Sequence, residues 1–176
     1  MSKRSIIHMF TPQEHTSPFD INMAVDAGYD LAFPYQGLKL HEIKDMTQDV
    51  IFSRGPAGVK KTGIFIGGRD IGLAMDMLEK TKKAMVPPFE VSVFADPSGA
   101  FTTAAALVAC VERELKKHFD TDFQGKKAIV FGGTGPVGLA TAVLAAEQGA
   151  NTTIVDHFSL DTALDYANEA KQRYGA

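Results

Sequence analysis

The sequence contains only one cysteine and lacks any long apolar run. The single thiol, Cys110, lies in the apolar stretch "AAALVACV", which excludes a disulfide framework and a thiolate metal site. We expect Cys110 to be a core residue and the setting to be reducing and cytoplasmic. No stretch reaches the length of about 18 apolar residues that a membrane helix needs, and the amino terminus lacks a secretory signal. We therefore expect neither a membrane partner nor export.

An excess of positive charge is also lacking. The chain has 18 basic and 21 acidic residues, so it does not have the electrostatic character of a nucleic-acid-binding protein. Its five histidines have no metal-ligand spacing, and no Ser-His-Asp or Cys-His arrangement is evident. We expect no metal and no nucleic-acid partner, and an acidic ligand would need local basic groups.

Apolar runs typical of strands alternate with amphipathic segments typical of helices. The sequence predicts strands at 5–10, 62–68, 90–96, 127–131 and 152–156, and helices at about 18–28, 70–85, 99–119, 136–149 and 159–174. For residues 31–35 and 49–53 the pattern does not separate strand from helix. Such alternation is typical of parallel sheets covered by helices. The predicted fold class is α/β, with an amino-terminal open parallel α/β domain followed by the beginning of a Rossmann dinucleotide-binding domain.

A glycine-rich motif marks the start of the second predicted domain. Gly133, Gly135 and Gly138 form G-x-G-x-x-G between a strand and a helix. The first glycine would permit the tight turn, the second the approach of a pyrophosphate, and the third close helix packing. Asp156 ends the next strand, where its carboxylate would accept hydrogen bonds from a ribose diol. We predict NAD as cofactor, with NADP possible if Lys126, Lys127 or His157 offsets that charge. The predicted cofactor-binding residues are Gly133, Thr134, Gly135, Pro136, Val137, Gly138, Asp156 and His157.

A polar segment at residues 120–127 separates the two predicted domains. It carries few apolar groups, so we place a substrate domain at 1–122 and a partial Rossmann domain at 123–176. At about 30 residues per βαβ step, the second stretch supplies less than half of a doubly wound domain. The nicotinamide half of the cofactor site is therefore not built by these residues.

Several longer segments resemble a known enzyme family. They are "SIIHMFTPQEHTSPFDINMAVDAGYD", "TQDVIFSR", "TGIFIGGRD", "VPPFEVSVFADPSGAFTTAAA" and "GKKAIVFGGTGPVG". Together, in this order and spacing, they resemble the bacterial NAD(P)-dependent methylene-tetrahydromethanopterin dehydrogenases of methylotrophic one-carbon metabolism, closest to the form able to use NAD. The family enzymes continue well past residue 176. We therefore expect this chain to correspond to the amino-terminal part of such an enzyme.

The resemblance implies an oxidoreductase that acts in formaldehyde oxidation. A hydride would pass from methylene-tetrahydromethanopterin to NAD(P) and leave the methenyl form. The substrate's own ring nitrogens stabilise the resulting cation, so positioning is the main task of the protein. The family binds its reduced pterin in the cleft between the domains. Because an unfinished sheet exposes an edge, we also expect a homo-oligomer.

Residues that follow the predicted strands are the candidates for binding the pterin. Ligands of parallel sheets lie beyond the carboxyl ends of the strands, and a carboxylate such as Asp20 or Asp96 could accept bonds from the pterin amino and ring N–H groups. Tyr35 and Arg54 could line the cleft. No catalytic residue is assigned, and Asp20 and Asp96 are the positioning candidates. The full set of predicted substrate-binding residues is Phe19, Asp20, Gly67, Gly68, Asp70, Asp96, Ser98, Gly99, Thr102 and Thr103.

Purely structural alternatives stay open for these residues. Asp20 and Asp70 could be helix N-caps, Asp96 could form an Asx-turn, and Thr102 and Thr103 could satisfy a helix start. Asp156 could be a solvated or capping acid, and the glycine turn could simply permit close packing.

Asp156 departs from the family pattern. The family is expected to have a small residue here in the enzyme that uses both cofactors and a basic residue in its NADP-specific relative.

Two further alternatives concern the whole protein. The chain could instead be a methylene-tetrahydrofolate dehydrogenase. That family commonly adds cyclohydrolase chemistry through a Tyr-x-x-x-Lys motif, which we expect to be absent. The other alternative is a non-catalytic fragment that binds pterin or assembles with longer subunits.

Overall fold

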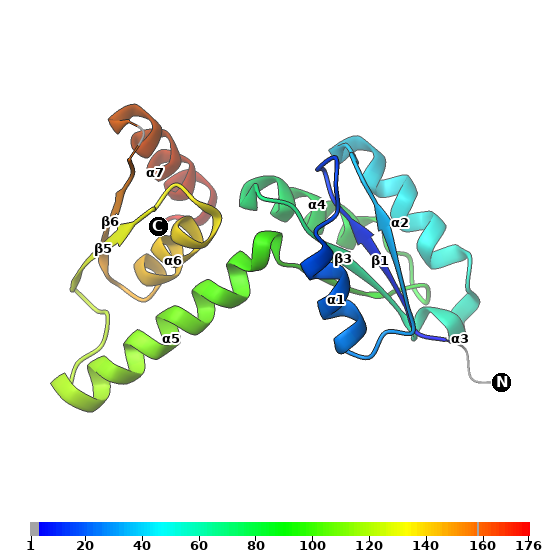
Figure 1. The fold of residues 1–176 in the computed structure, drawn as a ribbon, viewed down its shortest axis with the longest axis horizontal. Coiled ribbons are helices and arrows are strands. Elements are labelled where there is room, and N and C mark those ends of the chain that lie inside the picture. The colour runs from blue at the N-terminus through cyan, green and yellow to red at the C-terminus, as the bar shows by residue number, and fades with distance from the viewer. Residues whose placement is uncertain (1–3, 158) are drawn as a thin grey trace. The chain divides into compact units, whose positions relative to one another are not determined.

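A computed structural model describes residues 4–157 and 159–176, and its contacts divide the chain into two units, Met1–Pro97 and Ser98–Ala176. The first unit is built on four parallel strands in the order β2-β1-β3-β4 (Figure 1). Its strands are β1 (Ile6–Phe10), β2 (Leu31–Tyr35), β3 (Thr62–Ile66) and β4 (Ser92–Ala95), and its helices are α1 (Pro18–Asp26), α2 (Ile43–Phe52), α3 (Gly55–Val59) and α4 (Ile71–Ala84).

The strand order of the first unit creates a topological switch point. The chain leaves β1 through α1 and returns at β2 on one side, whereas it leaves β3 through α4 and returns at β4 on the other side. Neighbouring connections therefore diverge at the carboxyl ends of β1 and β3. In open parallel sheets this divergence opens the crevice in which ligands bind.

Alternating side chains of the sheet pack against helices on its two faces. Ile7 and Met9 form a buried cluster with Ala24 of α1. Phe10 of β1, which projects to the opposite face from Met9, is completely buried. The edge strand β2 contains Pro34, which lacks an N–H donor and is tolerated at an edge. The sheet is therefore a rigid layer whose carboxyl edge is fixed from both faces.

The second unit contains two parallel strands and three helices. Its elements are α5 (Ala100–Phe119), β5 (Lys127–Phe131), α6 (Pro136–Glu147), β6 (Asn151–Val155) and α7 (Leu160–Tyr174) (Figure 1). Val108 of α5 packs with Phe123, Ala145 and Ala150 in one buried cluster. Because α5 shares this core with α6, the compact units divide at residue 97 rather than in the polar segment near residue 122.

The sequence predictions of an α/β fold and of parallel sheets are confirmed. Of the two ambiguous segments, residues 31–35 form a strand and residues 49–52 end helix α2. The expectation that Cys110 is a core residue is wrong, because its side chain is exposed. Helix α5 buries Ala100, Ala104 and Val108, which are spaced four residues apart, and Cys110 lies two positions beyond this stripe.

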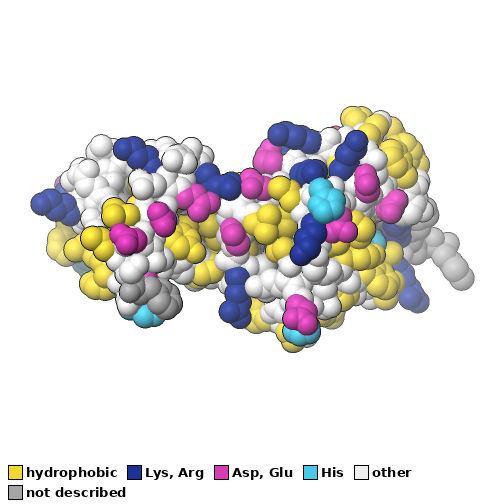
Figure 2. All heavy atoms as spheres, turned by 90° about the horizontal axis from the view of Figure 1, so that it is seen from above, with side chains coloured by type: hydrophobic (Ala, Val, Ile, Leu, Met, Phe, Trp, Pro, Cys, Tyr) yellow, Lys and Arg dark blue, Asp and Glu magenta, His cyan; other side chains and the backbone are white. Residues whose placement is uncertain are grey.

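Positive and negative side chains are interspersed on the surface in view in Figure 2. Among the described residues, no helix has the length and apolar character needed to cross a bilayer. Some of these opposite charges form exposed ion pairs within a helix, such as Lys82–Glu79 at 2.7 Å and Lys116–Glu112 at 2.6 Å. Such exposed pairs contribute little to stability.

Arg54 does not line the predicted ligand cleft. Its guanidinium donates to the carbonyl oxygens of Arg4 (2.9 Å) and Lys61 (3.1 Å) and to the hydroxyl of Thr62 (3.0 Å). These groups lie at the amino ends of β1 and β3, opposite the carboxyl edge. Arg54 therefore ties the starts of two neighbouring strands together.

We predict that Arg54→Met destabilises the protein by about 1–3 kcal/mol, because hydrogen bonds to a charged donor are lost and their acceptors are left unpaired. Lys44→Met is the matched control, because Lys44 is an exposed cation of α2. Urea denaturation of both variants measures the difference. An equal stability for the two variants would contradict the assigned role of Arg54.

Candidate functional site

The switch point of the first unit brings a carboxylate against a glycine. Asp20 lies in the first turn of α1, after the loop that follows β1. Gly67 directly follows β3, and its N–H donates to the carbonyl oxygen of Phe10 at the end of β1 (2.9 Å). A Cβ atom on Gly67 would lie 3.0 Å from Asp20 Oδ2 and 3.3 Å from the Phe65 ring. Glycine therefore leaves room for the Asp20 carboxylate at the end of β3, where an added Cβ would be in tight contact with it.

Gly68 is required for a different reason. It has a φ of +129°, and a Cβ there would lie 3.3 Å from Pro12 in the loop after β1. Side chains other than glycine rarely adopt that φ. The glycine pair therefore lets the loops after β1 and β3 approach each other.

A second carboxylate lies at the same edge of the sheet. Asp96 follows β4, its backbone N–H donates to the Ile66 carbonyl oxygen (3.1 Å), and the residue is only 8% exposed. Burial, and then the negative charge of Asp96, raises the pKa of Asp20 above the ordinary carboxyl value. The protein thus holds two acids close together although their ionised forms repel each other, and such arrangements are enriched at functional sites.

The other predicted pterin-binding residues of the first unit behave differently. Phe19 is 64% exposed at the start of α1. Asp70 is the N-cap of α4, and its Oδ1 accepts a bond from the N–H of Leu73 (2.9 Å). The capping alternative is therefore confirmed for Asp70. It is wrong for Asp20, which lies within the helix, because the N-cap position of α1 is Ser17.

Four predicted pterin-binding residues lie at the first residues of the second unit. Ser98 and Gly99 have positive φ values of 56° and 66°, directly before α5. The Thr102 hydroxyl donates to the Gly99 carbonyl oxygen at 3.4 Å, and the N-cap residue Gly99 has no side-chain capping bond, so this contact does not test the helix-start alternative. Thr103 Oγ1 would lie 3.8 Å from a Cβ at Gly99. Ligand binding by these residues stays a prediction.

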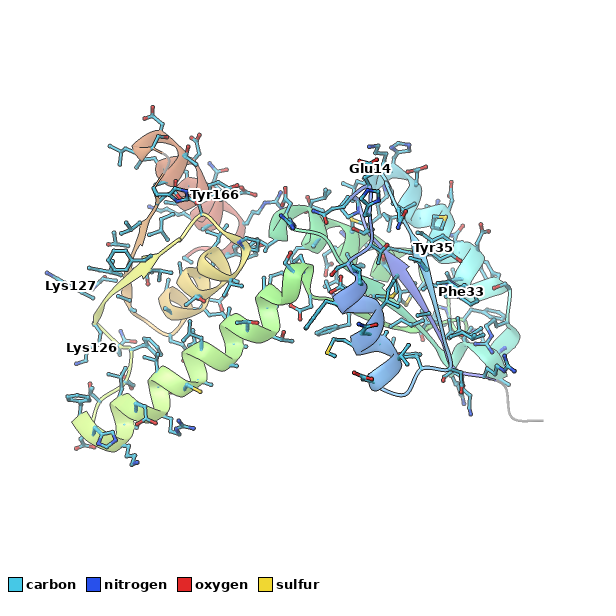
Figure 3. The ribbon with its side chains drawn as sticks, viewed as in Figure 1. Glu14, Phe33, Tyr35, Lys126, Lys127 and Tyr166 are labelled. Carbon is cyan, nitrogen blue, oxygen red and sulfur yellow. The ribbon has the colours of Figure 1, made fainter. Side chains whose placement is uncertain are left out.

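The expectation that no Tyr-x-x-x-Lys motif occurs is wrong. Tyr35 and Lys39 have this spacing; Tyr35 is the last residue of β2, and Lys39 lies in the loop that follows. The Tyr35 hydroxyl and His8 Nδ1 lie 3.1 Å apart, and the two rings stack with centroids 5.7 Å apart. Figure 3 shows Tyr35 and its neighbour Phe33 on β2. The Lys39 backbone N–H donates to Glu42 (2.6 Å), and Lys39 is exposed. The Tyr35 hydroxyl therefore has a partner in the fold, and the spacing alone carries no catalytic assignment.

Ionised Asp20 should make the stability of the protein pH-dependent. Because its pKa is raised in the folded state, the folded state binds more protons than the unfolded state, and stability falls as the pH rises from the ordinary carboxyl pKa through the raised value. We predict that Asp20→Asn flattens this fall and makes the variant relatively more stable at neutral pH. Thermal unfolding across the acid to neutral range measures it.

Asp26→Asn is the control for this effect, because Asp26 is an exposed acid on the same helix. A pH profile for Asp20→Asn that matches those of Asp26→Asn and the unsubstituted protein would contradict the burial of the Asp20 charge.

The glycine-rich turn of the second unit has the expected position but a different division of roles. Gly132, which is not part of the predicted motif, has the positive φ of 69° that permits the tight turn. Gly133 is needed for space, because a Cβ there would clash with the side chain of Ile154. Sequence reasoning missed Gly132 because the G-x-G-x-x-G pattern begins one residue later.

Gly138 and Pro136 have the backbone roles that the pattern predicts for them. A Cβ on Gly138 would clash with the carbonyl group of Gly132, so this glycine permits the helix to approach the turn. Pro136 is the first residue of α6, where no N–H donor is needed. Val137 follows in the same first turn. The start of α6 therefore presents backbone N–H groups and the positive end of the helix dipole.

Asp156 lies beside this turn and is not a solvated acid. Its side chain is 1% exposed, and its Oδ1 accepts a hydrogen bond from the Thr134 hydroxyl at 2.5 Å. His157 Nδ1 is 3.7 Å from the same oxygen, on a side chain that is 78% exposed. Lys126 and Lys127 lie at the amino end of β5 (Figure 3), about 13 Å or more along the strand from its carboxyl end. They are too far away to offset the charge of Asp156.

We predict that two neighbouring glycines respond differently to alanine. Gly138→Ala should destabilise the second unit by several kcal/mol, because the new methyl group would meet the backbone of Gly132. Gly135→Ala should leave the fold intact, because Gly135 has φ −74° and its Cβ would lie 3.4 Å from the nearest atom. Thermal unfolding compares the two. A tolerated Gly138→Ala would contradict the close approach of helix and turn.

No metal centre is evident in the part of the chain that the structure describes: no three His, Cys, Asp or Glu side chains gather within 4–157 and 159–176 in a way that could hold an ion. Two arrangements are therefore candidates for function: the acidic carboxyl edge of β1, β3 and β4, where the strand order predicts a crevice and which is called the acidic crevice below, and the glycine-rich turn before α6.

Comparisons with known proteins relate the sequence of this chain to one enzyme family. Residues 18–98 match the family described as methylene-tetrahydromethanopterin dehydrogenase, N-terminal. The chain is 51% identical over 172 residues to the NAD(P)-dependent methylenetetrahydromethanopterin dehydrogenase of Methylorubrum extorquens, which covers 98% of this chain and 58% of that protein. It is 34% identical over 174 residues to the bifunctional protein MdtA of the same organism, and this match covers 99% of this chain and 58% of that protein. The chain thus spans somewhat more than half the length of these relatives.

Likeness to solved structures is weaker. Ornithine carbamoyltransferase from Pyrococcus furiosus aligns with a TM-score of 0.47 at 17% identity, over 99% of this chain and 53% of that one. The NAD+-bound 3-phosphoglycerate dehydrogenase of Entamoeba histolytica aligns with a TM-score of 0.31 at 16% identity, over 89% of this chain and 55% of that one. Neither score bears on function. The sequence comparisons do, and they confirm that this chain resembles, over nearly its whole length, the amino-terminal part of the NAD(P)-dependent methylene-tetrahydromethanopterin dehydrogenases.

Proposed function

We propose that the chain is part of a dehydrogenase that moves a hydride from methylene-tetrahydromethanopterin to NAD(P), in the one-carbon metabolism of the cytoplasm. The observation that carries this proposal is the 51% identity to an enzyme of that name, which extends from the acidic crevice through the glycine-rich turn. The first unit would bind the reduced pterin. The second unit would be the first βαβ half of a Rossmann domain, and homo-oligomers are the proposed assembly.

The acidic crevice suits a reduced pterin because of its polarity. A pterin presents an amino group and a ring N–H side by side, and a carboxylate can accept hydrogen bonds from both. Asp20 and Asp96 supply such acceptors at the carboxyl edge. A donor-rich ligand would supply hydrogen bonds to the half-buried Asp20 carboxylate and would offset its repulsion by Asp96, the two causes, in this order, that raise the pKa of Asp20. Binding in this way holds the methylene carbon in a fixed place, which is the main task of the protein in a hydride transfer.

The residues of the glycine-rich turn fit the adenosine and pyrophosphate half of a dinucleotide. Gly133 and Gly138 leave space that a Cβ would fill, and the twelve-residue helix α6 begins at the turn. Its free N–H groups can hold the pyrophosphate oxygens. Asp156 lies at the end of β6, where the ribose hydroxyls of a dinucleotide are bound. When bound, the nicotinamide supplies the hydride acceptor, and the protein's part is to orient it.

The acid beside the turn favours NAD over NADP. A 2′-phosphate placed next to the buried Asp156 carboxylate would meet like charge at short range. The two lysines lie at the far end of β5, so of the three basic residues considered His157, whose side chain is largely exposed, is the one near enough to reduce that repulsion.

Steady-state kinetics test the proposed reaction. The protein purified from its source should form NADH from methylene-tetrahydromethanopterin, and more slowly NADPH, as measured by the absorbance of the reduced nicotinamide. A faster reaction with methylene-tetrahydrofolate would favour the folate enzyme instead. Pterin binding without any reduction of NAD or NADP would contradict the proposed reaction and would support the non-catalytic alternative.

Substitutions in the crevice should separate pterin binding from cofactor binding. We predict that Asp96→Asn and Asp20→Asn raise the KM for the pterin about tenfold or more and leave the KM for NAD within about twofold, because only the pterin would lose a charged acceptor. Asp26→Asn is the control, with no change expected. An increase confined to the KM for NAD would place the pterin elsewhere.

A further inference from the structure

We propose that Thr134 is a positioning residue that fixes the Asp156 carboxylate and thereby enforces the choice between a free and a phosphorylated ribose. This inference rests on the proposed dinucleotide site. It gives a function to a motif position that the G-x-G-x-x-G pattern leaves open to any residue.

The bond between these residues joins the carboxyl ends of two neighbouring strands. Thr134 lies in the turn after β5, and Asp156 directly follows β6. The ladder between the strands is extended by one further bond, from the Gly133 N–H to the Val155 carbonyl oxygen at 3.0 Å. The Thr134 hydroxyl then donates to Asp156 Oδ1 at 2.5 Å. The carboxylate is therefore held from the glycine-rich turn itself.

Thr134 holds the carboxylate more firmly than His157 does. A hydroxyl that donates to a carboxylate forms a short, charge-assisted bond, and the β-branch of threonine restricts its χ1 angle. His157 Nδ1 is farther from the same oxygen, at 3.7 Å, on a largely exposed side chain. The nearly complete burial of the Asp156 side chain, with 1% exposed, further limits its freedom.

A fixed carboxylate discriminates better than a mobile one. NAD and NADP differ only by the phosphate on one ribose hydroxyl. A carboxylate locked in place accepts the bonds of the free diol and repels the phosphate, whereas a carboxylate that can rotate would turn away from the phosphate and lose part of that repulsion. Discrimination through a repulsive group depends on its inability to move.

Binding of ADP-ribose and of 2′-phospho-ADP-ribose to the 176-residue chain tests this inference by calorimetry. Neither probe contains nicotinamide, so binding requires only the half-site that the described residues build. The unsubstituted chain should bind ADP-ribose more tightly. Thr134→Val, which keeps the shape but lacks the hydroxyl, should lower the ratio of the two Kd values about fivefold or more. Thr134→Ser keeps the donor and should retain most of the ratio.

Further variants separate positioning from a direct contact. In an Asp156→Ala background the ratio should be near one, and adding Thr134→Val should change it no further, because Thr134 acts through Asp156. Thr134→Ala gives a second variant without the hydroxyl if Thr134→Val fails to fold, as judged by thermal unfolding.

The outcomes distinguish this inference from the proposed function. If the unsubstituted chain binds neither probe, the dinucleotide site and the inference both fail. If it discriminates between the probes but Thr134→Val and Thr134→Ala keep the full ratio, only the inference is overturned. A further change of the ratio in the Asp156→Ala background would also overturn it, because Thr134 would then act on the ligand directly.

Discussion

Parallel pairing of β1 between β2 and β3 is the constraint on which the first unit depends. Parallel neighbours cannot be joined by a tight turn, so each connection must cross over a face of the sheet. Because β1 is central, the connection from β1 passes to one side and the connection from β3 to the other. The crevice between them follows from the topology and does not require special residues.

Local chemistry then fills that crevice with acids. Gly67 and Gly68 remove the side chains that would otherwise separate the loops after β1 and β3. Asp20 can therefore pack against the end of β3, where burial and the charge of Asp96 raise its pKa. Two repelling acids at one edge oppose stability, and such arrangements are enriched at functional sites, which supports the proposed role of this edge.

The sequence predicted the element types well where periodicity is strong and less well elsewhere. Helix α2 was ambiguous because its final residues are apolar and partly β-branched, as in a strand. Its buried residues Ile43, Thr47, Val50 and Ile51 nevertheless have helical spacing, so the signal was present. An apolar run predicts a core position for Cys110, but helix α5 buries only one stripe of that run, and Cys110 lies outside the stripe. Strand order cannot be read from such local patterns.

The candidate sites show the same limit. The rule that ligands bind beyond the carboxyl ends of strands selects Asp20, Asp70 and Asp96 alike, although the Asp70 carboxylate caps α4. Similarly, the glycine pattern located the turn, yet the residue with positive φ is Gly132. The bond between Thr134 and Asp156 joins residues 22 positions apart and depends on the register of β5 and β6, which no motif reports.

The most direct measurement is a crystal structure of the chain with a bound tetrahydromethanopterin derivative. We predict that the pterin ring lies in the crevice beside Gly67, with its amino and ring N–H groups within hydrogen-bond distance of Asp20 or Asp96. A pterin bound away from the carboxyl edge of β1, β3 and β4, with both carboxylates making no contact to it, would contradict the proposed pterin site.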